Sequence, residues 1–327
     1  MLLILNNYYK FILYFSLLDS KVFTMNNTWF LIVNPIAGNG NFNKHWSEIQ
    51  QELKLNNIIY KYTKTEYSNH ESTLVRQAIN KGYRKIISVG GDGTLHHVVN
   101  GIMFQDVVNS KEITVAVIPL GTGNDWIKTY NIPKNKKRAV NLIKNENTIF
   151  QDIGCLELAN TTSYFNNVAG IGYDGYVVSK LNTLKRFGSI AYLLSGIAGL
   201  LLYKKTTFNI AINNKFIKTK CLMTLFGICK YSGGGMQLTD FKDSNNGLFD
   251  ITIAKNLSFW DLLFSIRKLY NGEILKHRKV ETHLANSLLI TPQNNKYLPY
   301  IQADGELIGR GRVRVSIIES ALKIVIP

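Results

Sequence analysis

Three glycine-rich loops hold the residues of this sequence that are best suited to chemistry. They read Asn34-Pro35-Ile36-Ala37-Gly38-Asn39-Gly40, Gly90-Gly91-Asp92-Gly93-Thr94 and Pro119-Leu120-Gly121-Thr122-Gly123-Asn124-Asp125. Because glycine has no Cβ, backbone N–H groups in such loops can approach phosphate oxygens closely, and a helix beginning at Leu95 or Trp126 would add its positive end. One such loop is commonly a structural turn. Three of them, each placed after a predicted strand, indicate a phosphate-binding site.

Polar side chains within these loops suggest how a phosphate would be held. An aspartate beside a phosphate is repelled unless a cation lies between them, so Asp92 and Asp125 imply Mg²⁺. The amide of Asn34 can bind a ribose or a phosphate, or it can simply close an Asn-Pro turn. Thr94 can bind a phosphate, or it can cap the following helix. Both alternatives stay open at the level of the sequence.

The elements that position these loops alternate between strand and helix patterns. Short β-branched runs occupy 29–33, 58–62, 85–89 and 113–118, and helical periods lie between them, as at 45–55 and 71–79. Such alternation predicts a parallel, doubly wound sheet. Ligands of these sheets bind beyond the carboxyl ends of the strands, so the three loops should face one crevice.

The second half of the chain has a different pattern. From Ile153 onward, short strand-like runs are separated by Asn, Gly and Lys turns, with a helix predicted over Phe259 to Tyr270 and strand character at 312–327. We therefore expect an α/β nucleotide-binding domain at 25–152 and a β-rich substrate domain at 153–327, whose last strand is a candidate to return to the first lobe. No linker composition separates the halves, which predicts two apposed lobes with a cleft between them.

Two apolar stretches raise the question of a membrane. Residues 1–24 make a poor signal peptide and are too short for a spanning helix, so they are interpreted as sequence upstream of a start at Met25, or as an interfacial anchor. The run 187–203 carries no charge and is flanked by Lys and Arg on both sides. It is interpreted as a core helix, or as a helix near lipid headgroups.

Composition limits the class of protein. The chain of 327 residues is 46% hydrophobic, which excludes a disordered or fibrous protein, and 38 Lys and Arg against 22 Asp and Glu give a net charge of +16. That charge predicts a polyanionic partner: nucleic acid, an anionic membrane or a phosphorylated small molecule. The 3 cysteines form no CxxC pair, which argues against a disulfide framework or a zinc site and indicates a reducing cytoplasm.

The motifs resemble the diacylglycerol kinase catalytic-domain family, the bacterial soluble lipid kinases, whose superfamily also holds NAD kinases. The GGDGT loop is shared across the superfamily, while GTGND at 121–125 is typical of the lipid-kinase branch. The resemblance continues through the segments 166–175 (NNVAGIGYDG), 233–236 (GGGM), 247–250 (GLFD) and 303–306 (ADGE). It implies a two-lobed fold: an α/β nucleotide-binding lobe and a β-sandwich lobe, with the active site in the cleft between them.

The resemblance also implies roles for particular residues. Asp304 looks like the general base that accepts the proton of a lipid hydroxyl, with Glu306 beside it, although Asp304-Gly305 is also typical of a hairpin turn. The nucleotide-binding residues would be Asn34, Gly38, Gly90, Gly91, Asp92, Gly93, Thr94, Gly121, Thr122, Gly123, Asn124 and Asp125. Asp92 and Asp125 would share the Mg²⁺ of ATP. Phosphoryl transfer needs little else: in-line placement, a proton acceptor and cations on the phosphate.

Two positions depart from the family pattern. Asn39 stands where many members carry a basic residue. The segment 237–247, an Asp-rich loop that is a structural Mg²⁺ site in some bacterial diacylglycerol kinases, retains Asp240 and Asp243 but has Asn245 and Asn246. Neutral oxygens weaken a site for a hard divalent cation, so this second metal site is doubtful.

These observations favour an ATP-dependent lipid kinase, with diacylglycerol converted to phosphatidic acid. We expect a cytoplasmic protein, peripherally associated with the anionic inner face of the membrane; the segment 134–138, rich in Lys and Arg, is a docking candidate or a solvated helix start. The alternatives are a kinase of another lipid or of NAD, and a nucleotide- or lipid-binding protein without turnover. Nucleic acid is disfavoured because the charge is spread along the chain without a recognised binding module. The oligomeric state, including a homodimer, stays open.

Overall fold

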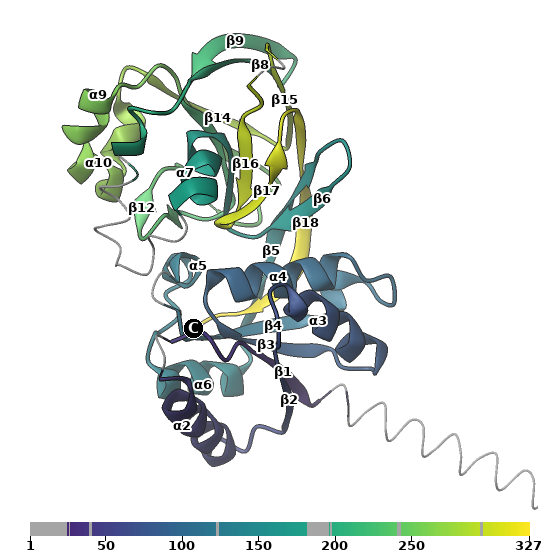
Figure 1. Cartoon of the computed structure of the whole chain (residues 1–327). Coiled ribbons are helices and arrows are strands. Elements are labelled where there is room, and N and C mark those ends of the chain that lie inside the picture. The colour runs from purple at the N-terminus through teal and green to yellow at the C-terminus, as the bar shows by residue number, and fades with distance from the viewer. Residues whose placement is uncertain are drawn as a thin grey trace, which may run out of the picture.

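The structure, a computed structural model, describes residues 25, 27–38, 41–121, 124–181, 196, 198–240, 243–294 and 297–327. Figure 1 shows an α/β lobe built from the first half of the chain and a strand-rich lobe built from the second half. Several predicted features lie outside the described residues: the segment 1–24, Asn39, Thr122, Gly123 and most of the apolar run 187–203.

The first lobe is the predicted parallel, doubly wound sheet. Its strands stand in the order β2-β1-β3-β4 and are all parallel: β1 (Trp29–Val33), β2 (Tyr60–Lys64), β3 (Lys85–Gly90) and β4 (Thr114–Pro119). The three inner strands are almost entirely buried, as continuous β-branched runs predict, whereas the edge strand β2 is half exposed. The fold class inferred from the sequence is therefore confirmed for this lobe.

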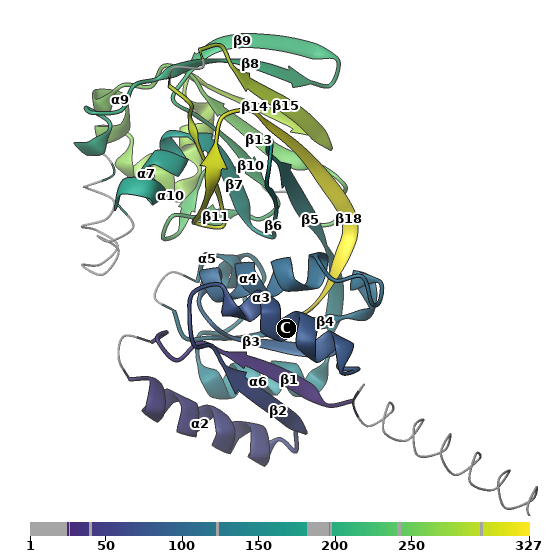
Figure 2. The same ribbon diagram turned by 45° about the vertical axis from the view of Figure 1, so that its right-hand side comes forward.

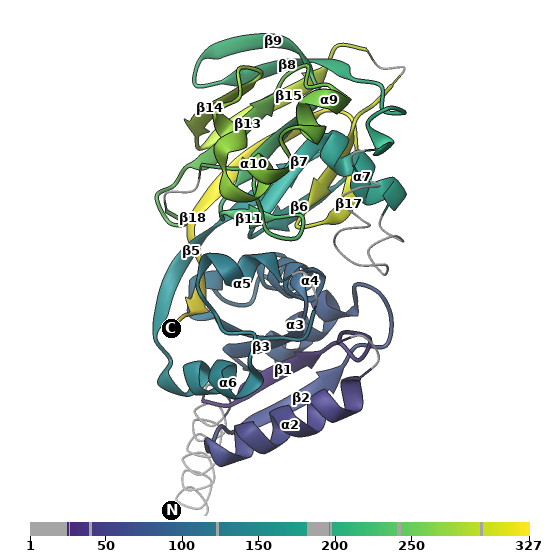
Figure 3. The ribbon, with the colours of Figure 1, turned by 90° about the vertical axis from the view of Figure 1, so that its left-hand side faces the viewer.

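Helices cover both faces of this sheet (Figure 3). They are α2 (Phe42–Leu55) and α6 (Lys136–Asn145) on one face, and α3 (His70–Asn80) and α4 (Asp92–Met103) on the other, with η1 (Ser110–Glu112) and α5 (Asp125–Thr129) in the connections. α2 buries an apolar stripe at Phe42, Trp46, Ile49 and Leu53, the spacing of one helical face. Helix α4 is buried on nearly all sides, because it lies between the sheet and the second lobe.

The second lobe packs two sheets against each other. One sheet contains β7 (Val168–Gly172), β10 (Met223–Gly227), β13 (Phe249–Ala254), β14 (Val280–Ala285), β16 (Tyr300–Ala303) and β17 (Glu306–Arg310). The other contains β5 (Thr148–Glu157), β6 (Thr162–Phe165), β8 (Thr206–Ile212), β9 (Lys215–Cys221), β15 (Ser287–Pro292) and β18 (Val313–Val325). The hairpin of β11 (Tyr231–Ser232) and β12 (Met236–Gln237) and the helices α7 (Tyr173–Leu181), α9 (Phe259–Leu263), α10 (Ile266–Asn271) and η3 (Glu273–Lys276) complete it. The predicted β-sandwich lobe is thus confirmed.

Two long strands join the lobes (Figure 2). β18 pairs antiparallel with β15 in the sandwich and then parallel with β4, so that Lys323 lies opposite Thr114 in the first lobe. β5 pairs antiparallel with β18 along both parts of that strand. The pairing register shifts between Ile318 and Leu322, where Ser320 has a φ of +49°. The carboxylate of Asp152 accepts the backbone N–H groups of Ser320 (2.7 Å) and Gly247 (2.8 Å) and fixes this bend. The bend in the strands that connect the two lobes is therefore held by specific hydrogen bonds.

Candidate active site

The loops after β1, β3 and β4 meet at one edge of the sheet, as predicted. The Asn34 side-chain amide donates to the hydroxyl of Thr94 across 3.0 Å, and its oxygen accepts the N–H of Ile36. A Cβ on Gly90 would lie only 2.3 Å from the same Thr94 hydroxyl. Asn34 therefore closes its own turn and also joins the first loop to the second.

Glycines bring the second and third loops into backbone contact. A Cβ on Gly121 would lie 2.8 Å from Gly91 Cα and 2.9 Å from Asn124 Oδ1, and the Asn124 amide donates to the Gly121 carbonyl at 2.5 Å. Asn124 itself has φ +43°, a left-handed conformation that asparagine tolerates. These glycines are therefore needed for the close packing of the two loops.

Asp92 lies in the first turn of α4, which begins earlier than the expected Leu95. Its Oδ2 accepts the N–H of Asp125 at 2.8 Å, and its Oδ1 lies 3.4 Å from the N–H of Trp126. The pKa of Asp92 is raised to about 6, first by loss of solvent around the carboxylate and then by the charges of Asp125 and Asp304, which together outweigh the lowering effect of the two N–H groups. Asp92 thus positions the start of α5 and carries a charge that its acidic neighbours disfavour.

Asp125 connects the two lobes. Its Oδ1 pairs with Lys128 at 2.6 Å, and its Oδ2 accepts the N–H of Gly234 at 2.7 Å from the β11–β12 turn of the sandwich lobe. Gly233, Gly234 and Gly235 all have positive φ, which allows this turn to present its N–H groups. Both carboxylate oxygens of Asp125 therefore have protein partners.

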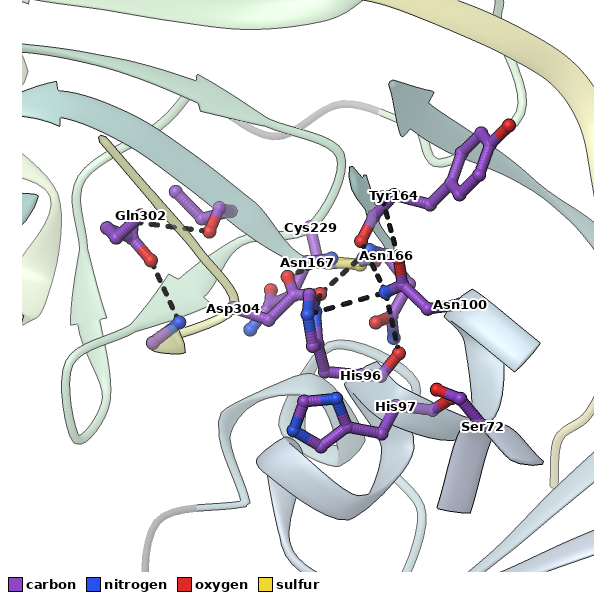
Figure 4. Close-up of polar contacts among 12 residues, drawn as sticks. Ser72, His96, His97, Asn100, Tyr164, Asn166, Asn167, Cys229, Gln302 and Asp304 are labelled. Carbon is purple, nitrogen blue, oxygen red and sulfur yellow. Dashed lines mark hydrogen bonds and ion pairs between the residues drawn. The ribbon is translucent and has the colours of Figure 1, made fainter. Parts of the chain in front are cut away.

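Asp304 lies in the two-residue turn between β16 and β17, with φ +51°, followed by Gly305 with φ +85°. The side chain is 2% exposed. Its Oδ2 accepts the N–H of Asn166 (3.1 Å) and faces Nδ1 of His96 (2.9 Å), while its Oδ1 accepts the N–H of Asn167 (2.9 Å). Figure 4 shows the carboxylate at the centre of this group. Asp304 therefore forms part of a hairpin turn, and its carboxylate is buried and hydrogen-bonded.

His96 reaches Asp304 from the opposite lobe. Its second ring nitrogen, Nε2, lies 3.3 Å from the Asn100 side-chain nitrogen, which donates to the carbonyls of His96 and Tyr164 at 2.9 Å each. Because a carboxylate oxygen only accepts, Nδ1 of His96 donates its N–H to Asp304. His96 is thus held between Asp304 of the sandwich lobe and Asn100 of its own helix.

Glu306 begins β17 and lies against the phosphate loop. A Cβ on Gly93 would lie 2.9 Å from Glu306 Oε1, so this carboxylate touches the first turn of α4. Its charge also helps to raise the pKa of Glu71, although burial of Glu71 is the larger cause. Asp304 and Glu306 therefore both face the GGDGT loop from the other lobe.

The doubtful second metal site gains no support. Asp240 is exposed, and Asp243 accepts the N–H of Asn245 at 3.3 Å within its own loop. Among the residues that the structure describes, no group of three or more His, Cys, Asp or Glu side chains is placed to hold a metal ion. A cation at Asp92 would need oxygens from elsewhere, as a nucleotide-borne Mg²⁺ has from its phosphates and waters. The raised pKa of Asp92 and its acidic neighbours fit such a cation.

Sequence reasoning missed several residues of this site. His96 and Asn100 are four positions apart on the helix that follows GGDGT, a spacing that puts them on one face, and this was the available signal. Asp152 gave no comparable signal, because it acts through contacts with distant backbone, and Gly234 was noted only as part of the GGGM motif at 233–236. Burial also lowers the pKa of neighbouring His97 to about 4, so its ring is neutral at physiological pH.

An α/β lobe with phosphate-type loops facing a β-sandwich lobe defines a class of two-lobed kinases. A crystal structure of a diacylglycerol kinase from Bacillus anthracis shares the fold, with a TM-score of 0.69, 20% identity and coverage of 92% of this chain and 97% of that one. Residues 28–156 match the diacylglycerol kinase catalytic domain, and 167–326 match the YegS C-terminal NAD kinase beta sandwich-like domain. The chain therefore belongs to the diacylglycerol kinase family of lipid kinases.

Named relatives agree with this assignment. The diacylglycerol kinase of Bacillus subtilis is 26% identical over 85% of this chain and 89% of its own length. The diacylglycerol kinase of Mycobacterium tuberculosis is 25% identical over 90% and 94%. In the described part of the chain, no helix is both long enough and apolar enough to cross a membrane.

Proposed function

We propose that the protein transfers the γ-phosphoryl group of ATP to the free hydroxyl of diacylglycerol, forming phosphatidic acid. The observation that carries this proposal is the meeting of two motifs where the two lobes contact each other. Asp304 and Glu306 of the sandwich lobe face the first turn of α4, which begins within the GGDGT loop. A proton acceptor next to a phosphate cradle is what phosphoryl transfer to an alcohol requires.

The phosphates would lie at the three loops. Backbone N–H groups at the start of α4, together with its dipole, favour an anion at that point. Thr94 and Asn34 already bind each other at 3.0 Å, so they would fix the loops around the nucleotide. The other residues of the GGDGT and GTGND loops would contribute to the same phosphate-binding site, as the sequence predicts.

Asp304 would accept the proton of the lipid hydroxyl. Hydrogen bonds from two backbone N–H groups and from His96 hold this carboxylate in position. Its Oδ1 accepts one of these bonds, and a carboxylate oxygen can accept two. Because the side chain is 2% exposed, the lobes must separate before the hydroxyl can reach it. Glu306, which touches the first turn of α4, would guide the hydroxyl toward the GGDGT loop.

Mg²⁺ would enter with ATP rather than as a resident ion. Asp92 would hold it, since a carboxylate with a raised pKa and acidic neighbours gains most from a cation. Asp125 is the second candidate, although its oxygens already contact Lys128 and Gly234. When bound, the ion neutralises charge on the phosphate oxygens.

A lipid substrate requires peripheral contact with the inner face of the membrane from the cytoplasm, which the net charge of +16 favours. The predicted docking cluster at 134–138 is weaker than its sequence indicates. Lys136 pairs with Glu48 at 2.6 Å and contacts His45, and Asn135 caps α6. This segment is thus partly committed to the structure of the first lobe.

Incubation of the purified protein with γ-labelled ATP, Mg²⁺ and a lipid extract tests the function. We expect label in a lipid that co-migrates with phosphatidic acid. Label in another lipid would change the substrate but keep the lipid kinase. Intact ATP binding with no labelled product would instead indicate a binding protein without turnover.

A further inference from the structure

Two aromatic side chains of the segment containing α9 and α10, Trp260 and Phe264, are exposed to solvent rather than buried in the core. Leu262, Ser265 and Leu269 are buried, whereas Trp260 is 62% and Phe264 is 80% exposed. The segment breaks at Phe264, where one continuous helix was expected. A segment that buries a serine and exposes a tryptophan and a phenylalanine has an apolar outer face that the core does not explain.

The two exposed rings form one unit. Their centroids lie 6.1 Å apart with an interplanar angle of 23°, so Trp260 and Phe264 stack in the solvent. Phe259 contacts the Trp260 ring edge-on at 5.3 Å and packs against the buried cluster below. The exposed pair is therefore fixed to the fold through Phe259.

Positive charge borders this apolar pair. Arg267 and Lys268 follow on α10, both are exposed, and neither has an ion pair among the described residues. The acidic residue of α9, Asp261, is neutralised by Lys279 at 2.5 Å and caps the helix through Ser258. The face as a whole is apolar and cationic, which complements an anionic surface with an apolar interior.

The same segment lies next to the phosphate loops. The Gln237 amide of β12 donates to the carbonyl of Tyr270 at 2.8 Å, and the turn between β11 and β12 donates from Gly234 to Asp125. Tyr270 is near enough to Asp125 for that charge to raise its pKa, together with the larger effect of burial. Figure 3 shows α9, α10 and α5 on the same side of the molecule. A surface bound at α9–α10 would thus adjoin the cleft.

We propose that Trp260, Phe264, Arg267 and Lys268 are the surface through which the protein docks on an anionic lipid bilayer. The rings would enter the boundary between headgroups and acyl chains, and the two cations would contact lipid phosphates. The proposal rests on the proposed lipid kinase function, because it names the part of the molecule that brings the cleft to its substrate.

Tryptophan fluorescence gives a direct test. Trp29, Trp46 and Trp126 are at most 6% exposed, so Trp260 is the one tryptophan of the 4 that can change its solvent contact on docking. Vesicles of equal parts phosphatidylcholine and phosphatidylglycerol should shift the emission to the blue, and brominated lipid should quench it. Trp260→Phe should remove the signal while the protein still sediments with the vesicles. No shift during wild-type sedimentation would overturn the proposal.

Paired variants test the surface by co-sedimentation without ATP. The double variants Trp260→Ser with Phe264→Ser, and Arg267→Gln with Lys268→Gln, should each weaken vesicle binding by about tenfold or more. The matched controls are on β9, where Phe216 is 87% exposed between exposed Lys215 and Lys218. Phe216→Ser, and Lys215→Gln with Lys218→Gln, should bind as the wild type does. Loss of binding in the β9 variants alone would overturn the proposal.

A soluble substrate separates this proposal from the kinase function. Short-chain diacylglycerol in solution should be phosphorylated equally by the wild type and by the Trp260→Ser, Phe264→Ser variant, because the surface lies outside the catalytic group. Full activity on this substrate with no wild-type vesicle binding would overturn the docking surface and leave the function intact. Absence of transfer with normal vesicle binding would overturn the function alone. A blue shift that grows with protein concentration in the absence of lipid would show that a second copy covers this face.

Discussion

Asp92 and Asp304 stand in the same dipeptide, Asp-Gly, on opposite sides of the contact between the two lobes, and their surroundings differ. Asp304 is surrounded by donors: two backbone N–H groups and the ring of His96. Asp92 accepts hydrogen bonds at the start of α5, but acidic neighbours and loss of solvent raise its pKa to about 6. The protein itself completes the site around Asp304. Under the proposed function, Asp92 would gain a counter-charge from a cation that arrives with the nucleotide, so a local motif alone does not define the environment of a carboxylate.

The largest expected effect tests the completed site. Asp304→Asn should lower kcat by about 10²–10⁴-fold, because the amide cannot accept the hydroxyl proton. ATP affinity should stay unchanged, since the phosphate loops are in the other lobe. The measurements are steady-state kinetics and nucleotide titration, with circular dichroism to confirm that the variant folds.

Glu306→Gln is the matched variant for the same comparison. Glu306 touches the Gly93 turn, and the hydrogen bonds described above for Asp304 come from other residues. Its loss should reduce kcat less than the loss of Asp304 does. A wild-type rate in Asp304→Asn together with an inactive Glu306→Gln would transfer the role of base to Glu306.

His96 positions Asp304, and two substitutions separate this role from packing. His96→Leu removes the Nδ1–H donor and should lower kcat by about tenfold with the KM for ATP unchanged, since a hydrogen bond to a charged group contributes about 1.5–3 kcal/mol. His96→Asn places an amide nitrogen near the same point and should recover most of that loss. Equal losses of kcat in both variants would show that His96 only fills space.

Asp92→Asn should stabilise the protein while removing its activity. A folded-state pKa raised from 3.8 to about 6 means that the wild type loses stability as pH rises through this window, because the native state binds the proton more tightly. The asparagine variant avoids that loss, so above pH 6 its free energy of unfolding should exceed that of the wild type by on the order of 1 kcal/mol. This figure is smaller than the full pKa shift implies, because Asp92 is partly exposed and solvent screens its charge.

Thermal melts from pH 4 to pH 8 measure this difference. The two melting temperatures should coincide near pH 4 and separate as pH rises to about 6. Wild-type protein that is the more stable above pH 6 would mean that Asp92 already has a favourable charge partner in the absence of nucleotide.

The sequence predicts that the three loops meet, because each loop follows a strand of the same parallel sheet. Parallel strands place their carboxyl ends at one edge, so the positions after Val33, Val89 and Ile118 determine where Asn34, Asp92 and Asp125 lie. The two-residue turn at Asp304 could also be anticipated from Asp-Gly between two strands. These features depend on local pattern and on a topology that the alternation of strands and helices predicts.

Contacts between the lobes could not be predicted in the same way. Helix α4 is buried on both sides, so its apolar period does not reveal that His96 faces Asp304 rather than the sheet. The helix predicted over 259–270 likewise does not reveal what covers Trp260 and Phe264, which are exposed. In both cases the partner comes from a different part of the chain, or from outside it.

The smallest expected effect concerns the packing that holds Asp92 in place. Gly121→Ala brings a Cβ within 2.8 Å of Gly91 Cα, a backbone atom that cannot rotate away, so the GGDGT and GTGND loops must move apart. We expect a loss of stability of about 1–2 kcal/mol and weaker ATP binding. Gly91→Ala, whose Cβ would lie 3.4 Å from Gly121 Cα, should cost less, and Gly196→Ala, whose Cβ would have no neighbour within 4 Å among the described residues, should be neutral. If Gly121→Ala and Gly196→Ala melted alike and bound ATP alike, the loops would have room to separate. The position of Asp92 would then depend on its hydrogen bonds to the start of α5 rather than on the glycines beside it.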